Sequence, residues 1–249
     1  MKKIILIILF TSFSPFYLTG QIDTTFESGS ISIGIDFDNF IKIDRELKNI
    51  VKCGDAKKII NNMEISGDFD FIPNSIFEFT EVTFLSINSS KKIKIGNAIN
   101  KMKALTTIRI TSEVTFMSKG IVLPNLSNVY FGMYTAKKIP QLIFECSKLE
   151  YLTLEGGSYK TVPREIANLK ELKLLNLSAN KLNKLPDEIG QLSNLRVLSL
   201  DGNLLSALPN TICNLKKLEE LYILNNPNLN VDNEIKQCLT FMPNLNIVY

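Results

Sequence analysis

One step length repeats through the second half of this chain: Leu149, Leu172, Leu195 and Leu218 stand 23 residues apart. Each leucine opens the pattern Leu-x-x-Leu-x-Leu, which is followed by a polar turn, an apolar residue, proline and Ile-x-x-Leu. The clearest copies are ELKLLNLSANKLNKLPDEIGQLS at residues 171–193 and NLRVLSLDGNLLSALPNTICNLK at residues 194–216. Self-similarity at a fixed period of this length is typical of a solenoid, in which each unit buries its apolar side chains against its neighbours. A solenoid offers a binding surface more readily than an active site.

Upstream of Leu149 the repeats are degenerate, but the apolar spacing that defines them continues. We count eight repeats, which start near Ile60, Val82, Leu105, Leu126, Leu149, Leu172, Leu195 and Leu218. The sequence therefore predicts a repeat domain over residues 57–249.

Both ends of a solenoid need an atypical unit that covers the exposed core. At the amino-terminal end, the alternation of Ile31, Ile33 and Ile35 predicts a strand, and apolar residues at helical spacing follow it. We assign residues 31–56 to this cap, within a leader and cap at residues 21–56. At the other end, a helix from about Asp232 and a final strand near residues 245–248 predict a second cap at residues 232–249.

With these motifs in view, residues 57–249 resemble leucine-rich repeats of the short type whose second half reads Leu-Pro-x-x-Ile-x-x-Leu. The resemblance is most specific from Leu149 to Leu224. It implies an α/β fold: a curved right-handed coil with a parallel β-sheet on the concave face and irregular or helical turns on the convex face. It also implies that Asn180, Asn203 and Asn226, which share the position just after the strand, point inward and form a ladder of bonds to the backbone. Upstream that position holds Asp68, Ser90, Glu113, Tyr134 and Gly157, so we expect an incomplete ladder there.

Strand residues that do not point into the core must face the concave surface, because side chains alternate along a strand. Tyr and Arg are frequent anchors of protein interfaces, and several lie at these outward positions. We therefore expect a binding stripe on the concave face. An alternative is that Tyr and Val are present only as good strand formers on an exposed sheet. The candidate binding residues are Arg109, Tyr130, Tyr151, Thr153, Leu174, Asn176, Val197 and Tyr222.

Composition argues against several other functions. The chain has 28 basic and 25 acidic residues and no histidine. The near-neutral balance lacks the electrostatic footprint of a nucleic-acid binder, and the absence of histidine removes the commonest general base and metal ligand. We expect no catalytic residues, no metal site and no cofactor. The predicted function is a non-catalytic module that binds a protein or a glycan.

Two other classes of function remain open. One is a structural or adhesive surface spacer without a single ligand. The other is a hydrolase that uses concave carboxylates such as Glu155 and Asp201. These two lie two coils apart, roughly 10 Å at the usual strand spacing, which is long even for an inverting glycosidase.

The amino terminus has the pattern of a secretory signal. Lys2 and Lys3 precede a continuously apolar run at residues 4–10, which is too short for a membrane span. We assign residues 1–20 to a signal peptide with cleavage after Gly20, and we predict export and no transmembrane segment in the mature chain. The alternative is an uncleaved anchor.

Four cysteines raise the question of disulfides in an exported protein: Cys53, Cys146, Cys213 and Cys238. Cys146 and Cys238 occupy a leucine position of the repeat and are interpreted as small buried hydrophobes. They are four coils apart, too far for a bond that needs alpha carbons within about 7 Å. Only Cys213 and Cys238 could pair. The sequence leaves that open, with the unpaired state favoured.

Overall fold

The computed structural model describes residues 5–8, 16–19, 24–27, 30–35, 48, 60–116, 120–132 and 137–248. The chain divides into two compact units, residues 1–125 and 126–249. Each unit is described by itself.

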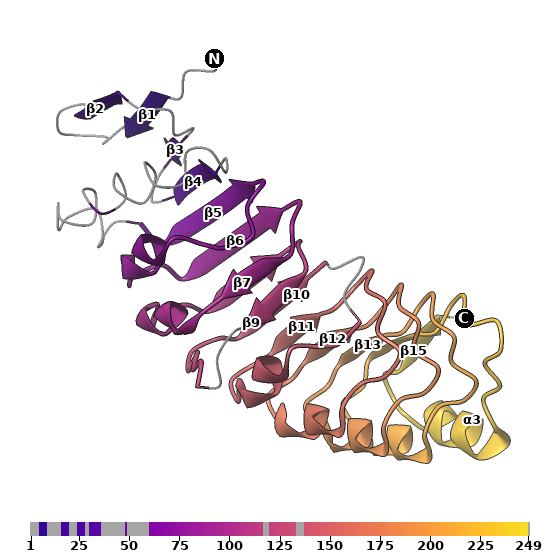
Figure 1. Ribbon diagram of the computed structural model, residues 1–249. Coiled ribbons are helices and arrows are strands. Elements are labelled where there is room, and N and C mark those ends of the chain that lie inside the picture. The colour runs from indigo at the N-terminus through magenta and orange to yellow at the C-terminus, as the bar shows by residue number, and fades with distance from the viewer. Residues whose placement is uncertain are drawn as a thin grey trace. The chain divides into compact units, whose positions relative to one another are not determined.

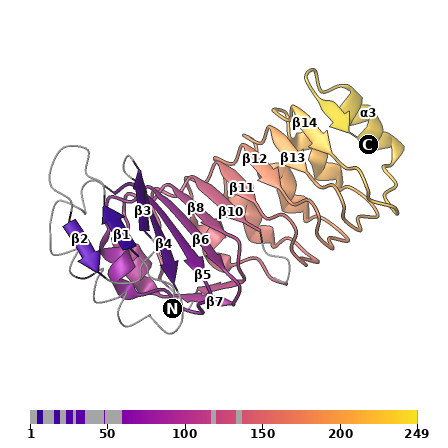
Figure 2. The ribbon, with the colours of Figure 1, turned by 90° about the horizontal axis from the view of Figure 1, so that it is seen from above.

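The second unit contains one parallel ladder of short strands that follow one another in chain order (Figures 1 and 2). Each partner in the register is displaced by one repeat, so that Tyr151 pairs with Leu174, and Leu174 with Val197. The first five strands begin two residues after the repeat starts expected from the sequence. They are β10 (Asn128–Phe131), β11 (Tyr151–Thr153), β12 (Leu174–Asn176), β13 (Val197–Ser199), β14 (Glu220–Tyr222) and β15 (Asn246–Val248).

A short 3-10 helix follows each of the first four of these strands, on the side of the stack away from the sheet (Figure 1). A proline stands immediately before each helix, where its fixed φ suits the turn out of the extended chain. In the third copy, the Ile189 N–H donates to the Pro186 carbonyl at 3.1 Å, an i to i+3 bond of the 3-10 type. The helices are η4 (Gln141–Glu145), η5 (Arg164–Asn168), η6 (Asp187–Gln191) and η7 (Asn210–Asn214).

The core of the second unit lies between the sheet and these helices. Leu177 and Leu200, at equivalent positions of neighbouring coils, are both 0% exposed. The same burial holds for the leucines that open the repeats, such as Leu172 and Leu195. The predicted interior of stacked leucines is therefore confirmed. Tyr159 takes the position that Leu182 and Leu205 hold in the next two coils, and it too is fully buried.

The far end of the second unit is closed by α3 (Asn233–Thr240) and β15. The Asp232 carboxylate caps α3 by accepting from the Ile235 N–H at 2.9 Å. This N-cap satisfies one of the backbone donors that a helix start leaves without a partner.

The cysteine prediction is wrong at this end of the chain. Cys213 in η7 and Cys238 in α3 form a disulfide, with alpha carbons 5.9 Å apart. The interpretation assumed that Cys238 continues the leucine position of the repeat. The last coil carries an α-helix where the others carry a 3-10 helix, so Cys238 is only half-buried and meets Cys213. Cys146 is a buried free cysteine, as expected.

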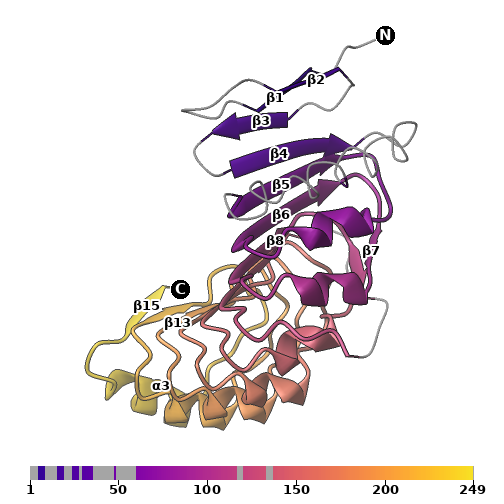
Figure 3. The same ribbon diagram turned by 90° about the vertical axis from the view of Figure 1, so that its left-hand side faces the viewer.

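In the first unit, β4 (Ser30–Ile35), β5 (Asn62–Gly67), β6 (Phe84–Ser89) and β8 (Thr107–Ile110) form a parallel ladder (Figure 3). The 3-10 helices η2 (Asn74–Glu78) and η3 (Asn97–Lys101) alternate with these strands. A second, two-stranded parallel ladder joins β7 (Ile93–Ile95) to β9 (Val114–Phe116), an element that the sequence did not predict.

Most of the predictions for the amino-terminal region stay predictions. β4 pairs with β5 where the cap strand was expected, but most of the expected cap helix lies outside the described residues, as does Cys53. Within the predicted signal peptide, β1 (Ile5–Ile8) pairs antiparallel with β2 (Phe16–Thr19). In the leader that follows, β3 (Thr24–Glu27) pairs with β1 and β4. Among the helices of the described residues, none has the length and apolarity that crossing a bilayer requires.

Candidate binding surface

An asparagine ladder fixes the turns that follow the strands of the second unit. The Asn203 side-chain amide donates to the Leu177 and Leu200 carbonyls, each at 2.9 Å, and its oxygen accepts from the Leu182 N–H at 3.0 Å. Asn180 and Asn226 repeat this geometry one coil earlier and one coil later. All three are at most 9% exposed. Because a buried backbone group without a partner is costly, the ladder holds the strand ends rigidly and leaves these residues no contact with a ligand.

The residue before each asparagine of the ladder adopts a left-handed backbone. The φ angle is between 55° and 70° at Ala179, Gly202 and Asn225, and also at Gly156, which precedes Gly157 at the equivalent position one coil earlier. These four residues stand one repeat apart. Glycine and asparagine tolerate this region well, and alanine does so at a cost. The turns after β11, β12, β13 and β14 therefore share one conformation, which directs the outward side chains of successive strands in the same way.

The first unit has a serine ladder in place of the asparagine ladder. The Ser112 hydroxyl donates to the Ser89 carbonyl at 2.8 Å, and the Ser89 hydroxyl bonds to both backbone groups of Phe69. Ser89 and Ser112 are buried. Sequence reasoning missed both residues because they stand one position before the asparagine position, which holds Ser90 and Glu113.

The outward side chains of the second unit form what we call the outer sheet face, the side of β10 to β15 opposite the core. It consists of three rows that run across the strands. Row one is Asn128, Tyr151, Leu174, Val197, Glu220 and Asn246; row two is Tyr130, Thr153, Asn176, Ser199, Tyr222 and Val248. Row three, just past the strand ends, is Gly132, Glu155, Ser178, Asp201 and Leu224.

The candidate residues of the second unit all lie on this face, but they do not form one continuous stripe. Tyr151, Leu174 and Val197 are adjacent in row one. Tyr130 and Tyr222 stand in row two, separated by three polar residues, which include the candidates Thr153 and Asn176. Arg109 lies on β8 of the first unit, opposite Ser86, and is therefore not counted with them.

The three tyrosines of the face differ in their surroundings. Tyr151 is 44% exposed. The Tyr130 ring lies over its own strand. A Cβ added to Gly132, two residues later, would stand 3.3 Å from that ring. The Tyr222 hydroxyl donates to the Glu220 carboxylate at 2.7 Å. This bond, burial and the negative charges of Glu220 and Asp201 raise the pKa of Tyr222, so it stays a neutral donor at physiological pH.

Polar residues of the face are held by neighbours on adjacent coils. The Asn176 amide donates to the Glu155 carboxylate at 3.3 Å, and its oxygen accepts from the Ser178 N–H at 2.9 Å. The Asp201 carboxylate accepts from the Leu224 N–H at 2.7 Å. These bonds fix the positions of the side chains before any ligand arrives, which lowers the entropic cost of binding.

The start of each strand carries a separate row of charges. Glu150 and Lys173 form an ion pair at 2.7 Å, and Arg196 and Glu219 another at 2.9 Å. The hydrogen bond that Lys173 donates to the Glu150 carboxylate also raises the pKa of Lys173. This row is balanced within itself, so it contributes little net charge to the neighbouring face.

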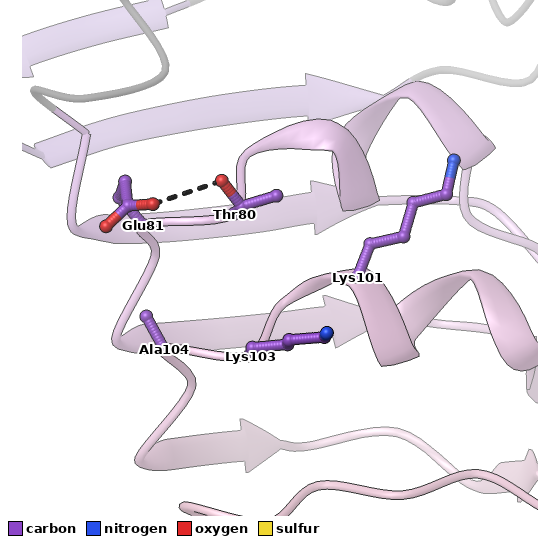
Figure 4. Close-up of a pocket in the computed structure, with 5 residues that line it drawn as sticks. All are labelled: Thr80, Glu81, Lys101, Lys103 and Ala104. Carbon is purple, nitrogen blue, oxygen red and sulfur yellow. Dashed lines mark hydrogen bonds between the residues drawn. The ribbon is translucent and has the colours of Figure 1, made fainter.

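A second candidate, in the first unit, is an open hollow of about 580 Å³ lined by Thr80, Glu81, Lys101, Lys103 and Ala104 (Figure 4). Thr80 bonds to Glu81 at 3.2 Å, and Lys101 pairs with Glu78 outside the hollow. Its polar groups do not converge on a common point (Figure 4). Nor do the described residues contain a group of three or more acidic or cysteine side chains that could hold a metal ion.

Known proteins share this architecture. A family model described as a leucine-rich repeat region matches residues 134–248. Residues 134–248 therefore form a leucine-rich repeat region. Its repeats have the parallel strands, 3-10 turns and asparagine ladder described above, so the predicted fold is confirmed. Leucine-rich repeat domains typically serve as binding modules without catalytic activity.

Solved structures of bacterial leucine-rich repeat proteins share this fold. A leucine-rich repeat protein of Leptospira interrogans is 21% identical, with 88% of this chain and 59% of that chain covered and a TM-score of 0.63. InlP of Listeria monocytogenes is 19% identical, with 87% and 60% covered and a TM-score of 0.61. An internalin of the same organism is 16% identical, with 77% and 54% covered and a TM-score of 0.58. The chain thus spans little more than half the length of these proteins. No curated protein is similar enough in sequence to serve as a relative.

Proposed function

We propose that this protein is an exported, non-catalytic binding module that recognises a segment of another protein on the outer sheet face. The apolar row of Tyr151, Leu174 and Val197 carries this proposal. These three side chains are adjacent on rigid strands and none is fully buried. Contiguous exposed apolar groups, rimmed by polar ones, are typical of protein interaction sites.

The exported state has separate support. The amino-terminal pattern of Lys2, Lys3 and an apolar run is that of a signal peptide. A disulfide between Cys213 and Cys238 is expected in an oxidising compartment rather than in the cytosol.

The other functions have less support. A hydrolase would need Glu155 and Asp201 to act together, but they lie two strands apart and each is bonded to a neutral donor of the protein. A pure spacer would not require an apolar row on the exposed face of the sheet. A glycan ligand would use the same aromatic residues, so an experiment must distinguish a glycan from a protein segment.

Selection of a random peptide library on the full chain tests the proposal. We expect selected peptides to lose at least tenfold in affinity when Tyr151→Ala and Tyr222→Ala are combined, because anchors of this type cost about 1–2 kcal/mol or more each. The control is Leu204→Ala with Phe241→Ala, which removes two exposed apolar side chains that lie off the outer sheet face. Equal binding by both double variants, or no selected peptide at all, would refute a protein-binding role for this face.

A further inference from the structure

The outer sheet face carries an unbalanced negative charge. Its three rows contain the carboxylates of Glu155, Asp201 and Glu220 and no Lys or Arg. Two of these carboxylates, Glu155 and Asp201, lie in row three on coils two apart, and Glu220 ends the apolar part of row one. The negative groups therefore border the apolar residues on two sides.

None of the three carboxylates is neutralised by a cation within the part of the chain that the structure describes. Glu155 accepts from the Asn176 amide, Asp201 from the Leu224 N–H, and Glu220 from the Tyr222 hydroxyl. All three donors are neutral. Since an ionised carboxylate accepts up to about four hydrogen bonds, each group has capacity left for a charged donor from outside.

The charges at the strand starts show that this imbalance is local to the face. There, Glu150 and Glu219 each have a cationic partner on the adjacent coil, Lys173 and Arg196. The hydrogen bond to Glu220 and the negative charges of Glu220 and Asp201 raise the pKa of Tyr222, so both carboxylates act on row two of the face at β14.

We infer that the outer sheet face binds an extended protein segment in which Lys or Arg side chains stand beside apolar ones. This inference rests on the proposed binding function and specifies its partner. The apolar side chains would lie on Tyr151, Leu174 and Val197, and the cations would reach the carboxylates at the border of that row. The exposed ring of Tyr151 adds a surface for cation–π contact. Complementary charge at such a border governs the specificity and rate of association.

The test compares two variants of equal net charge. The first combines Glu155→Gln, Asp201→Asn and Glu220→Gln, which keep the acceptor oxygens. The second combines Glu145→Gln, Glu165→Gln and Glu188→Gln, one on each of the helices η4, η5 and η6. The probes are the library-selected peptides and versions in which every Lys and Arg is replaced by Gln. Fluorescence anisotropy at low and high salt measures the affinity.

We expect the selected peptides to be enriched in Lys and Arg. The first triple variant should weaken their binding by about 1.5- to 5-fold for each carboxylate removed, on the order of tenfold in total. The second should change it by less than about twofold, and salt should weaken binding to the wild type and to the second variant much more than to the first. Peptides that require Tyr151 and Tyr222 but show no basic enrichment and no response to the first triple variant would overturn this inference and leave the proposed function standing. Peptides that ignore the tyrosines would overturn both.

Discussion

Asn203 illustrates at the residue scale how one side chain serves two coils. Its amide and oxygen together satisfy the Leu177 and Leu200 carbonyls and the Leu182 N–H, all of them in the interior. We expect Asn203→Ala to lower the free energy of unfolding by about 1–3 kcal/mol, because it leaves the buried Leu182 N–H without a partner and removes one of the two amide donors to each carbonyl. Urea unfolding of the full chain measures the change.

The matched control is Asn183→Ala, an exposed asparagine on the preceding coil. It should alter stability by less than about 0.5 kcal/mol. Similar losses for both variants would mean that the ladder contributes no more than an ordinary surface residue.

The asparagine ladder could be anticipated because one residue type recurs at the repeat period, at Asn180, Asn203 and Asn226. The serine ladder could not. Ser89 and Ser112 also stand 23 residues apart, but serine is common in turns and they are one position out of phase with the asparagines. A hydroxyl reaches less far than an amide, so the chain must bring the backbone closer, and the sequence does not show that approach.

At the scale of elements, the 3-10 helices of neighbouring coils pack closely at Gly190. A Cβ added to this glycine would lie 2.7 Å from the Thr211 Cβ and closer still to the Thr211 carbonyl oxygen. The obstacle is backbone of the adjacent helix η7, which cannot move aside as a flexible side chain could. Gly190→Ala should therefore destabilise the protein by about 1–3 kcal/mol.

Gly96→Ala is the control for this substitution, since a Cβ at Gly96 meets nothing within 4 Å and the residue is extended. It should be neutral or slightly stabilising, because alanine narrows the unfolded ensemble. Thermal unfolding of both variants compares them directly. A stable Gly190→Ala protein would show that the spacing of η6 and η7 adapts easily.

The strands and turns of the second unit were accessible to sequence reasoning for a physical reason. Inward leucines two apart identify a strand, and a proline that opens each turn marks its end, as at Pro186. The ladder of β7 and β9 carried no comparable signal. Ile93 and Ile95 alternate with Lys94 over only three residues, and such a short run pairs only because the coil brings Val114 beside it. The residues of the outer sheet face follow from the same repeat period, but the expected stripe overlooked that Tyr130 and Tyr222 stand in a different row from the apolar residues.

At the scale of the whole molecule, the Cys213–Cys238 disulfide closes the carboxyl-terminal end of the second unit. Stability in a solenoid is close to a sum of neighbour contacts, so an end coil opens more easily than an inner one. The link spans 25 residues, and a closed loop of this size stabilises a fold by about 3 kcal/mol. The disulfide was not expected because the repeat period places position 236, not 238, beside Cys213. The α-helical turn of α3 brings Cys238 to Cys213 instead.

Reduction should therefore act locally. We expect a Cys213→Ser, Cys238→Ser protein to lose hydrogen-exchange protection first in α3 and β15, with β11 and β12 affected much less. Reductant added to the wild type should produce the same pattern and should have no further effect on the double variant. Cys146 provides an internal reference, because burial raises the pKa of its thiol to about 12 and keeps it protonated and unreactive. Uniform loss of protection across the second unit would instead show that the coils unfold as one cooperative body, and that the disulfide stabilises all of them rather than the end alone.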